Sequence, residues 1–195
     1  RSHTATHLLQ KALRMVLGTH VEQAGSYTDA DHVRFDFTHF AAVTQEELVK
    51  IEDIVNDAIF AAYPVITEEV PIDEAKKRGA MALFGEKYGS TVRVVQAGDF
   101  SIELCGGTHL TNTAQAGMFK IISESSVAAG VRRIEALTGK GVLNFLQEKQ
   151  TLILDTAKAL KTTPHDLLGK IEQLLEEIRD TNKKVEKLSA KVANM

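Results

Sequence analysis

The fold is decided by one alternating stretch, which reads His32-Val33-Arg34-Phe35-Asp36-Phe37-Thr38-His39. Its valine and its two phenylalanines occupy every second position, as expected for a β-strand that buries one face. A second extended stretch, Val21 to Tyr27, precedes it across the turn-forming segment Thr28-Asp29-Ala30-Asp31. Together these segments predict a β-hairpin.

Helical patterns flank the predicted hairpin on both sides. From Ser2, apolar residues recur at helical spacing as far as Gly18, a glycine that should end the helix. After the hairpin, Thr44 and Glu47 form a capping-box pattern that begins a second helix, which Pro64 should end. The apolar stripe of this second helix is expected to cover a sheet.

The middle of the chain is expected to be mostly extended. A short helix, Asp73–Ala82 with Asp73 as its cap, and a glycine-bounded loop, Phe84–Gly89, interrupt the extended segments. The predicted strands are Pro64–Ile72, Val92–Val95, Ser101–Leu104, Met118–Glu124 and Val131–Leu137. Residues 1–140 are therefore predicted to form an α+β domain, a mainly antiparallel sheet with packed helices.

Residues 141–195 have a different, purely helical character. A break at Thr162-Thr163-Pro164 separates two predicted helices, the second with a threonine cap and Pro164 in its first turn. A heptad seam runs along the second helix through Leu167, Ile171, Leu174, Ile178, Thr181, Val185, Leu188 and Val192. The pattern predicts a helical hairpin or coiled coil that starts a dimerisation region, although a solvated helix packed on its own partner fits equally well.

Length and composition are those of a soluble globular protein, since 195 residues with 44% hydrophobic side chains can supply a core. The formal net charge of -3 gives no overall basic field, so a nucleic acid would need a local basic patch. The single cysteine excludes an intramolecular disulfide, and no apolar run has the length of a membrane span. We expect a cytoplasmic protein, and the start at Arg1 inside a helical pattern indicates an excised fragment.

Two pairs of metal-binding side chains stand far apart in the sequence. His3 and His7 are four residues apart on the first predicted helix, so both imidazoles project from one face. Cys105 and His109 follow a predicted strand, and the two glycines between them let the backbone curl so that thiolate and imidazole converge. Either pair alone is a weak signal, whereas the two together predict one shared metal site.

Three imidazoles and one thiolate favour zinc over magnesium, calcium or manganese. A purely structural zinc remains an alternative, because four protein ligands describe a closed site whereas hydrolytic zinc sites usually keep one position open. The other histidines lack ligand spacing and are expected to be surface or structural residues: His20, His32, His39 and His165.

Several segments, in order along the chain, resemble the editing domain of alanyl-tRNA synthetases. The resemblance covers residues 1 to about 140, and the tail fits it least well. The matching segments are Ser2–Leu9, Gly18–Ser26, Arg34–Phe37, Gly79–Gly89, Glu103–His109 and Gly130–Ala136.

The resemblance implies the fold of the common threonyl/alanyl-tRNA synthetase editing domain and hydrolysis of the ester that joins serine or glycine to tRNA(Ala). It also implies that the metal ligands are His3, His7, Cys105 and His109, with Gln23 as an editing residue. Zinc would then either activate a water or anchor the aminoacyl end at the tRNA acceptor terminus. Cys105 as a covalent nucleophile is the less favoured alternative, because a zinc-bound thiolate is a poorer nucleophile.

Other candidate site residues follow from their chemistry. Gln23 can donate and accept hydrogen bonds to orient the substrate or a water, and Gly106 and Gly107 could offer backbone donors to a developing oxyanion. Each of them has an ordinary structural role as its alternative. Candidate phosphate contacts, each equally explicable as a solvated charge, are Lys76, Lys77, Arg78, Lys87, Arg132 and Arg133.

The sequence leaves other readings of function open. No aminoacylation core, with its ATP site, precedes the predicted domain, so the chain is expected to deacylate tRNA but not to charge it. A free-standing trans-editing protein or a threonyl-type editing domain is one alternative. A zinc-stabilised RNA-binding or dimerisation module without catalysis is the alternative of another class.

Overall fold

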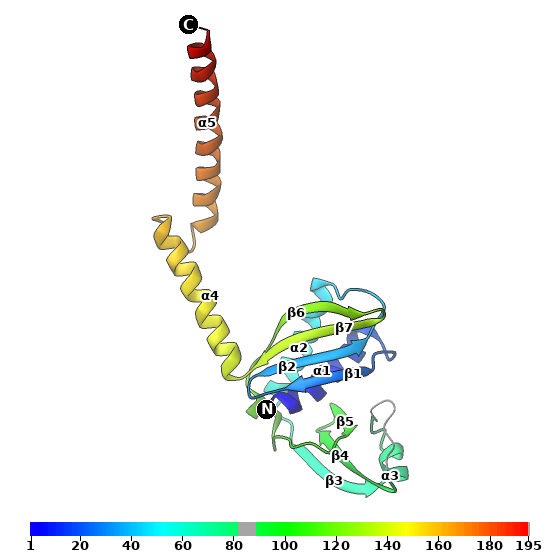
Figure 1. Ribbon diagram of the computed structural model, residues 1–195. Coiled ribbons are helices and arrows are strands. Elements are labelled where there is room, and N and C mark those ends of the chain that lie inside the picture. Colours follow the sequence, from blue (N-terminus) through cyan, green and yellow to red (C-terminus); the bar gives the residue numbers. More distant parts are fainter. Residues whose placement is uncertain (82–88, 195) are drawn as a thin grey trace. The chain divides into compact units, whose positions relative to one another are not determined.

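The computed structural model describes residues 1–81 and 89–194. The chain divides into two compact units, residues 1–144 and 145–195, each of which is considered by itself (Figure 1). The first unit is the α+β domain that the sequence predicted, and the second unit is helical. The finer domain boundary at residue 140 stays a prediction.

Helix α1, Ser2–Leu17, is the central element of the first unit. It contacts α2 and strands of both sheets, and Leu8, Leu9 and Leu13 on it are fully buried. Its polar residues Thr4 and Gln10 are buried as well. Because α1 is enclosed on several sides, the residues near its N-terminus lie within reach of more than one strand.

The predicted hairpin forms as β1, Gln23–Thr28, and β2, His32–Thr38, and belongs to an antiparallel sheet of order β1-β2-β7-β6. Its other two strands are β6, Phe119–Ala128, and β7, Val131–Thr138. Phe35 of β2 lies opposite Ile134 of β7, and both side chains are fully buried. The alternation of β2 therefore turns its aromatic residues into the main core.

Helix α2, Gln45–Phe60, begins with the predicted capping box, in which both Thr44–Glu47 hydrogen bonds form. It packs against α1 and is tied to the free edge of β6 (Figure 1). Asn56 donates to and accepts from the Phe119 backbone, and Glu52 accepts the Ile121 N–H. These bonds satisfy backbone groups of a strand that lies at the edge of the sheet among the described residues.

The remaining strands form a second antiparallel sheet of order β3-β4-β5. They are β3, Val65–Pro71, β4, Thr91–Ala97, and β5, Ser101–Leu104, with a small core of their own. The sequence suggested that β5 and β6 were consecutive strands of one sheet. They lie in different sheets instead, because a 3-10 helix, Thr113–Ala116, intervenes and packs on α1 and α2.

The short helix α3, Ile72–Lys77, differs from its prediction at both ends. Pro71 is its N-cap residue, and Asp73 lies in the first turn without capping it. Pro71 keeps the extended backbone of β3, and the helix begins directly after it at Ile72. The predicted loop Phe84–Gly89 lies outside the described residues except for Gly89.

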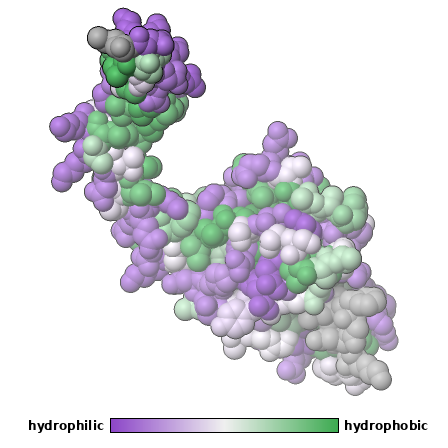
Figure 2. All heavy atoms as spheres, turned by 45° about the horizontal axis from the view of Figure 1, so that its top comes forward, coloured by the Kyte–Doolittle hydropathy of each residue, from purple (hydrophilic) through white to green (hydrophobic). Residues whose placement is uncertain are grey.

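The second unit contains most of α4, Lys140–Ala159, and all of α5, Leu167–Ala193. Asp166, not a threonine, is the N-cap of α5, and Pro164 lies before the helix because Thr163 bonds Asp166 in a separate turn. No described residue of α5 is buried, and Figure 2 shows hydrophobic side chains at the surface of this unit. No helix among the described residues is long and apolar enough to cross a membrane.

Candidate metal centre

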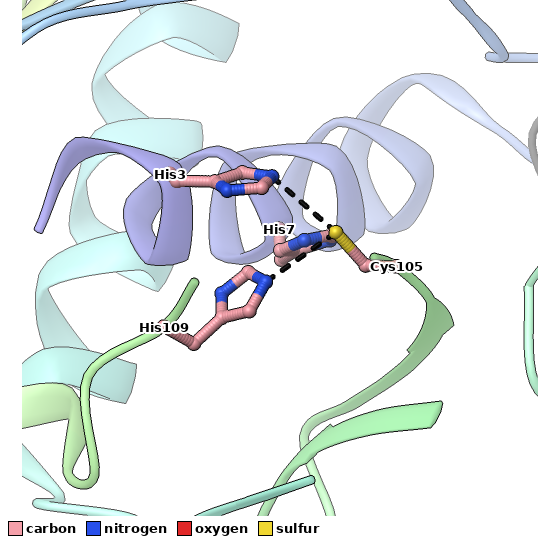
Figure 3. A group of neighbouring side chains, drawn as sticks. All are labelled: His3, His7, Cys105 and His109. Carbon is pink, nitrogen blue, oxygen red and sulfur yellow. Dashed lines mark hydrogen bonds between the residues drawn. The ribbon is translucent and has the colours of Figure 1, made fainter. Parts of the chain in front are cut away.

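Four side chains from two separate elements meet beside α1 (Figure 3). His3 and His7 stand one turn apart on α1, and Cys105 and His109 come from the loop that follows β5. Their ligand atoms all lie within 4.8 Å of one another. The structure therefore brings together the two pairs that the sequence separates by about half of the chain.

The distances at the thiol approach those of a tetrahedral ligand set. Cys105 Sγ lies 3.4 Å from His3 Nε2 and 3.3 Å from His109 Nε2. Bond lengths of 2.0–2.3 Å around zinc place ligand atoms about 3.3–3.8 Å apart. These two separations therefore fit a shared ion, while the widest separations in the cluster exceed a closed tetrahedron.

The loop between Cys105 and His109 depends on glycine at one position. A Cβ atom at Gly107 would lie 2.0 Å from His3 Cε1, whereas one at Gly106 would meet nothing within 4 Å. The Gly107 N–H donates to Cys105 Sγ at 3.4 Å. Gly107 thus serves the thiol and the close approach of the His3 ring, and its N–H is not free for the predicted oxyanion role.

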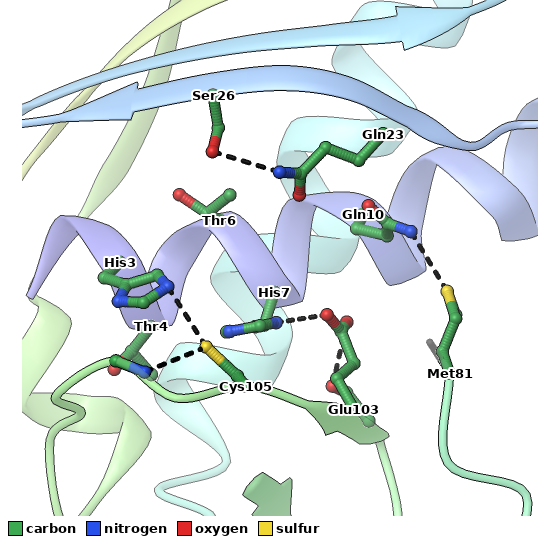
Figure 4. Close-up of polar contacts among 12 residues, drawn as sticks. His3, Thr4, Thr6, His7, Gln10, Gln23, Ser26, Met81, Glu103 and Cys105 are labelled. Carbon is green, nitrogen blue, oxygen red and sulfur yellow. Dashed lines mark hydrogen bonds and ion pairs between the residues drawn. The ribbon is translucent and has the colours of Figure 1, made fainter. Parts of the chain in front are cut away.

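Two of the imidazoles are held from their far side (Figure 4). His7 Nδ1 contacts the Glu103 carboxylate, whose other oxygen lies 3.5 Å from Ser101 Oγ. His109 Nδ1 lies 3.3 Å from Thr4 Oγ1. In both histidines the contact on Nδ1 leaves Nε2 as the nitrogen that can bind a metal.

The residues present fit a zinc ion. His7 Nε2 is buried and has no hydrogen-bond partner among the described residues, which is costly for a polar atom unless something binds it. The glycine at 107 keeps open the space that a Cβ would take from the His3 ring. Three imidazoles and one thiolate are also the donor chemistry that zinc prefers.

The electrostatics of the cluster favour the thiolate form. Burial would raise the pKa of the Cys105 thiol, but hydrogen bonds from His109 and His3, the nearby imidazole of His7 and a hydrogen bond from the Gly107 N–H outweigh it and lower the pKa to about 3. Burial likewise would lower the pKa of His7, but its contacts with Cys105 and Glu103 raise it to about 9. Because imidazole and thiolate bind a metal only without their protons, metal binding should weaken in acid.

A cavity of about 460 Å³ borders this cluster through Glu103. Ser101 and Met81 line it from one side, and Lys11 and Arg78 bring positive charge to it. Its volume lies in the range of small-ligand sites in proteins. None of the four metal ligands lines the cavity, so Glu103 is the residue that connects it to the cluster, and the Asp99 carboxylate also faces it.

Gln23 lies on β1, across α1 from Glu103 in the view of Figure 4. Its side-chain nitrogen donates to Ser26 Oγ at 3.1 Å. Thr6, which is buried, lies on the same side of α1 as this pair, whereas the buried Gln10 donates to Met81 Sδ at 3.0 Å. The geometry holds the Gln23 amide in place, and its catalytic role stays a prediction.

Two of the predicted phosphate contacts are engaged by carboxylates. Arg132 makes a bidentate pair with Glu124 at 2.5 and 2.7 Å. Arg133 makes another with Asp36 at 2.7 and 2.9 Å. Either arginine would have to share or exchange its partner before it could bind phosphate.

The other predicted phosphate contacts lie near α3. Arg78 pairs with Glu68 and Glu74 and also lines the cavity beside the metal ligands. Lys76 and Lys77 are exposed, and Lys87 lies outside the described residues. Their binding of RNA stays a prediction.

The histidines expected to be structural lie outside the cluster. His20 and His39 bond one another, with 2.9 Å between Nε2 and Nδ1, and stack beside the exposed ring of Phe40. Burial of His39, together with the charge of His20, lowers the pKa of His39. His32 is half-buried on β2 and His165 is exposed.

Sequence reasoning missed three residues that organise the cluster: Thr4, Arg93 and Glu103. Arg93 donates to the Cys105 and Gly107 carbonyl groups and so holds the loop, yet its position in β4 gives no sign of this. Glu103 could have been found, because a residue two before Cys105 in a strand shares its face. Thr4 is a common residue in a predicted helix, and nothing in the sequence indicates its contact with His109.

Residues 92–135 match the family described as threonyl and alanyl tRNA synthetase second additional domain. This match includes β4, β5 and the loop that carries Cys105 and His109. This part of the first unit therefore matches the class of domain that these synthetases share.

The whole chain also matches alanine–tRNA ligases. It is 57% identical to that of Acetivibrio thermocellus over 194 residues, 100% of the chain, and 54% identical to that of Listeria innocua over 194 residues. The identity to the enzyme of Pelotomaculum thermopropionicum is 53% over 193 residues. The chain spans 22% of the length of each relative. These matches confirm the resemblance to the editing-domain segment of alanyl-tRNA synthetase.

Proposed function

We propose that this chain is a proofreading hydrolase that removes serine or glycine from wrongly charged tRNA(Ala), as a part of an alanyl-tRNA synthetase. The observation that carries the proposal is the four-ligand cluster, whose contact residue Glu103 also lines a polar cavity, in a chain related throughout to alanine–tRNA ligases. Such an activity answers a physical need, because a pocket for alanine cannot exclude smaller glycine and rejects serine only modestly.

Zinc is the proposed ion, with His3, His7, Cys105 and His109 as its ligands. When bound, it would supply the positive charge of a Lewis acid next to the ester. The ligand role of Cys105 is favoured over a nucleophilic one because a metal-held thiolate is a poorer nucleophile. His109 is likewise assigned as a ligand, since its Nε2 faces the thiol.

Gln23 is the proposed substrate-orienting residue. Because Ser26 holds the amide nitrogen of Gln23, the amide oxygen is left to accept a hydrogen bond from the amino group of the bound aminoacyl ester. Removal of this acceptor should slow deacylation without loss of the metal. The test is the deacylation rate of Gln23→Ala, compared with the parent protein at equal zinc content.

The tRNA acceptor end is the proposed partner of the cavity side of the domain. Lys11 and Arg78 line that cavity, and the exposed Lys76 and Lys77 lie on the adjoining helix α3. Positive side chains of this kind position phosphates without reading bases. Lys76→Ala with Lys77→Ala should therefore raise KM for mischarged tRNA more than it lowers kcat.

The test of the proposal is release of serine or glycine from purified Ser-tRNA(Ala) and Gly-tRNA(Ala). We expect deacylation by the zinc-loaded chain, little action on Ala-tRNA(Ala), and loss of activity after chelation that zinc restores. Cys105→Ala should abolish both metal binding and deacylation. A folded, zinc-loaded chain that leaves mischarged tRNA intact would reject the hydrolase and favour a non-catalytic RNA-binding module.

Self-association through α5 is a second proposed property. Its apolar residues are unusually open to solvent, with Leu188 at 61% and Val192 at 72% exposure. An amphipathic helix normally buries such a stripe against a partner. Sedimentation over a range of concentrations should show a dimer, and Ile178→Glu should return it to a monomer.

A further inference from the structure

Glu103 is a buried carboxylate whose side chain contacts one proposed metal ligand and one neighbour on its own strand. Its side chain is 8% exposed and contacts His7 Nδ1 with one oxygen. The other oxygen lies within 3.5 Å of Ser101 Oγ, a neighbour on the same strand. A buried carboxylate is costly unless it is paired and hydrogen-bonded, and a positive charge on His7, from a proton or from a metal ion on its far side, meets this requirement.

Thr4 makes the corresponding contact at His109. The Leu110 N–H donates to Thr4 Oγ1 at 3.1 Å, and His109 Nδ1 lies 3.3 Å from the same oxygen. A hydroxyl oxygen has two lone pairs, so it can accept both N–H groups. When a metal ion takes the place of the hydrogen bond between His109 Nε2 and Cys105 Sγ, the hydrogen atom of His109 can stay on Nδ1, so that Nε2 is available to the ion.

We infer that Glu103 and Thr4 are positioning residues of the metal centre, which fix the orientation and the tautomer of His7 and His109 so that both Nε2 atoms face one ion. The contacts occur on the nitrogens that point away from the cluster, as in the outer contacts of protein zinc sites. The inference rests on the proposed zinc ion, and it assigns to these two residues a role separate from ligation and from chemistry.

The two residues differ in what they contribute. Glu103 adds a negative charge that, with the Cys105 thiolate, balances the two positive charges of a zinc ion. Thr4 adds only direction, because its hydroxyl is neutral. We therefore expect the larger effect on zinc affinity from Glu103, and the smaller effect from Thr4.

The test is a zinc affinity measured by competition with a chromophoric chelator, on the full chain at one pH. Glu103→Gln should bind zinc about 10- to 100-fold more weakly, and Thr4→Val about 10-fold more weakly. Thr4→Ser keeps the hydroxyl and should keep most of the affinity. The matched controls are Glu69→Gln and Thr67→Val, two exposed positions on β3 that should leave the affinity unchanged.

A second measurement separates positioning from a general loss of stability. The d–d absorption bands of the Co²⁺-loaded chain report on the ligand geometry, so Glu103→Gln should shift them while Glu69→Gln should not. Unchanged bands and an affinity within about twofold of the parent protein would overturn the inference yet leave the metal site intact.

The remaining outcomes are also decisive. A folded parent chain that takes up neither Zn²⁺ nor Co²⁺ would overturn the proposed metal site and the inference together. If Glu103→Gln does not fold, the comparison of Thr4→Val with Thr4→Ser decides, because these two differ in the hydroxyl that holds His109. Equal affinities in that pair would overturn the inference.

Discussion

Helices α1 and α5 are both amphipathic, yet they differ completely in burial. Nine residues of α1 are buried, and no described residue of α5 is. The difference lies in their surroundings, because α1 contacts α2 and strands of both sheets. Periodicity therefore specifies which face of a helix is apolar, whereas only a packed partner turns that face into stability and into a rigid platform for side chains.

The largest effect should come from a matched pair of leucines. Leu9 on α1 is fully buried, and Leu188 on α5 is 61% exposed. Leu9→Ala should lower the free energy of unfolding by about 2–5 kcal/mol, through lost burial and a cavity. Leu188→Ala should leave it within about 0.5 kcal/mol.

Tyrosine fluorescence during urea unfolding measures this difference in the first unit alone, since the tyrosines are residues 27, 63 and 88. An equal loss of stability in the two leucine variants would refute the contrast between the helices. It would mean that α5 packs against the domain in solution.

The next effect concerns the loop that α1 meets. Gly107→Ala places a Cβ 2.0 Å from His3 Cε1, so the imidazole must move, whereas Gly106→Ala meets nothing within 4 Å. A displacement of this size should lower deacylation by about 100-fold, together with zinc affinity. Similar zinc affinities in the two alanine variants would show that the enclosed site tolerates movement.

A smaller effect should follow from the helix caps. Thr44→Ala removes the bond that the Thr44 hydroxyl accepts from the Glu47 N–H, while the reciprocal bond from the backbone N–H of residue 44 remains, and should cost about 1 kcal/mol of the unfolding free energy of the first unit. Thr163→Ala removes the turn that precedes α5 and should leave that unfolding unchanged. Urea titrations of both variants, followed by tyrosine fluorescence, measure the two unfolding free energies. A lower unfolding free energy of the first unit in Thr163→Ala would contradict this prediction.

The smallest effect should be the acid dependence of the Asp36–Arg133 pair. The Arg133 guanidinium lowers the pKa of Asp36, so the pair stabilises the fold above the ordinary pKa of aspartate and loses this contribution as pH falls through the lowered value. The contribution should be at most about 1 kcal/mol for a pair that is partly open to solvent. Arg133→Gln should destabilise at pH 7 and match the parent in strong acid; a constant difference would exclude this linkage.

Much of the fold followed from the sequence where local signals agreed. The alternation around Phe35, the capping box at Thr44 and the glycine after α1 each specify backbone geometry through nearest neighbours. The start of α3 and the start of α5 were wrong by a few residues, because Pro71 and Asp166 compete with the residues expected to cap them. Local competition of this kind has no sharp sequence signature.

The sequence predicted the four ligands of the candidate site, but it did not predict the residues that hold those ligands in place. Cys105 and His109 stand out because their residue types and spacing are chemically rare. Glu103 and Thr4 are common residues whose importance depends on what lies beside them. The role of Arg93 likewise follows only from the tertiary structure, which places its strand β4 beside the loop so that it donates to the Gly107 carbonyl group.

The sequence by itself determined the types of the elements, the apolar faces and the chemical identity of the four metal-binding side chains. These are local properties, fixed by residues a few positions apart. Tertiary structure alone decided that the strands divide into two sheets and that α1 contacts both. Only this enclosure brings residues about one hundred positions apart within 4.8 Å, because such a meeting depends on the packing of the whole domain.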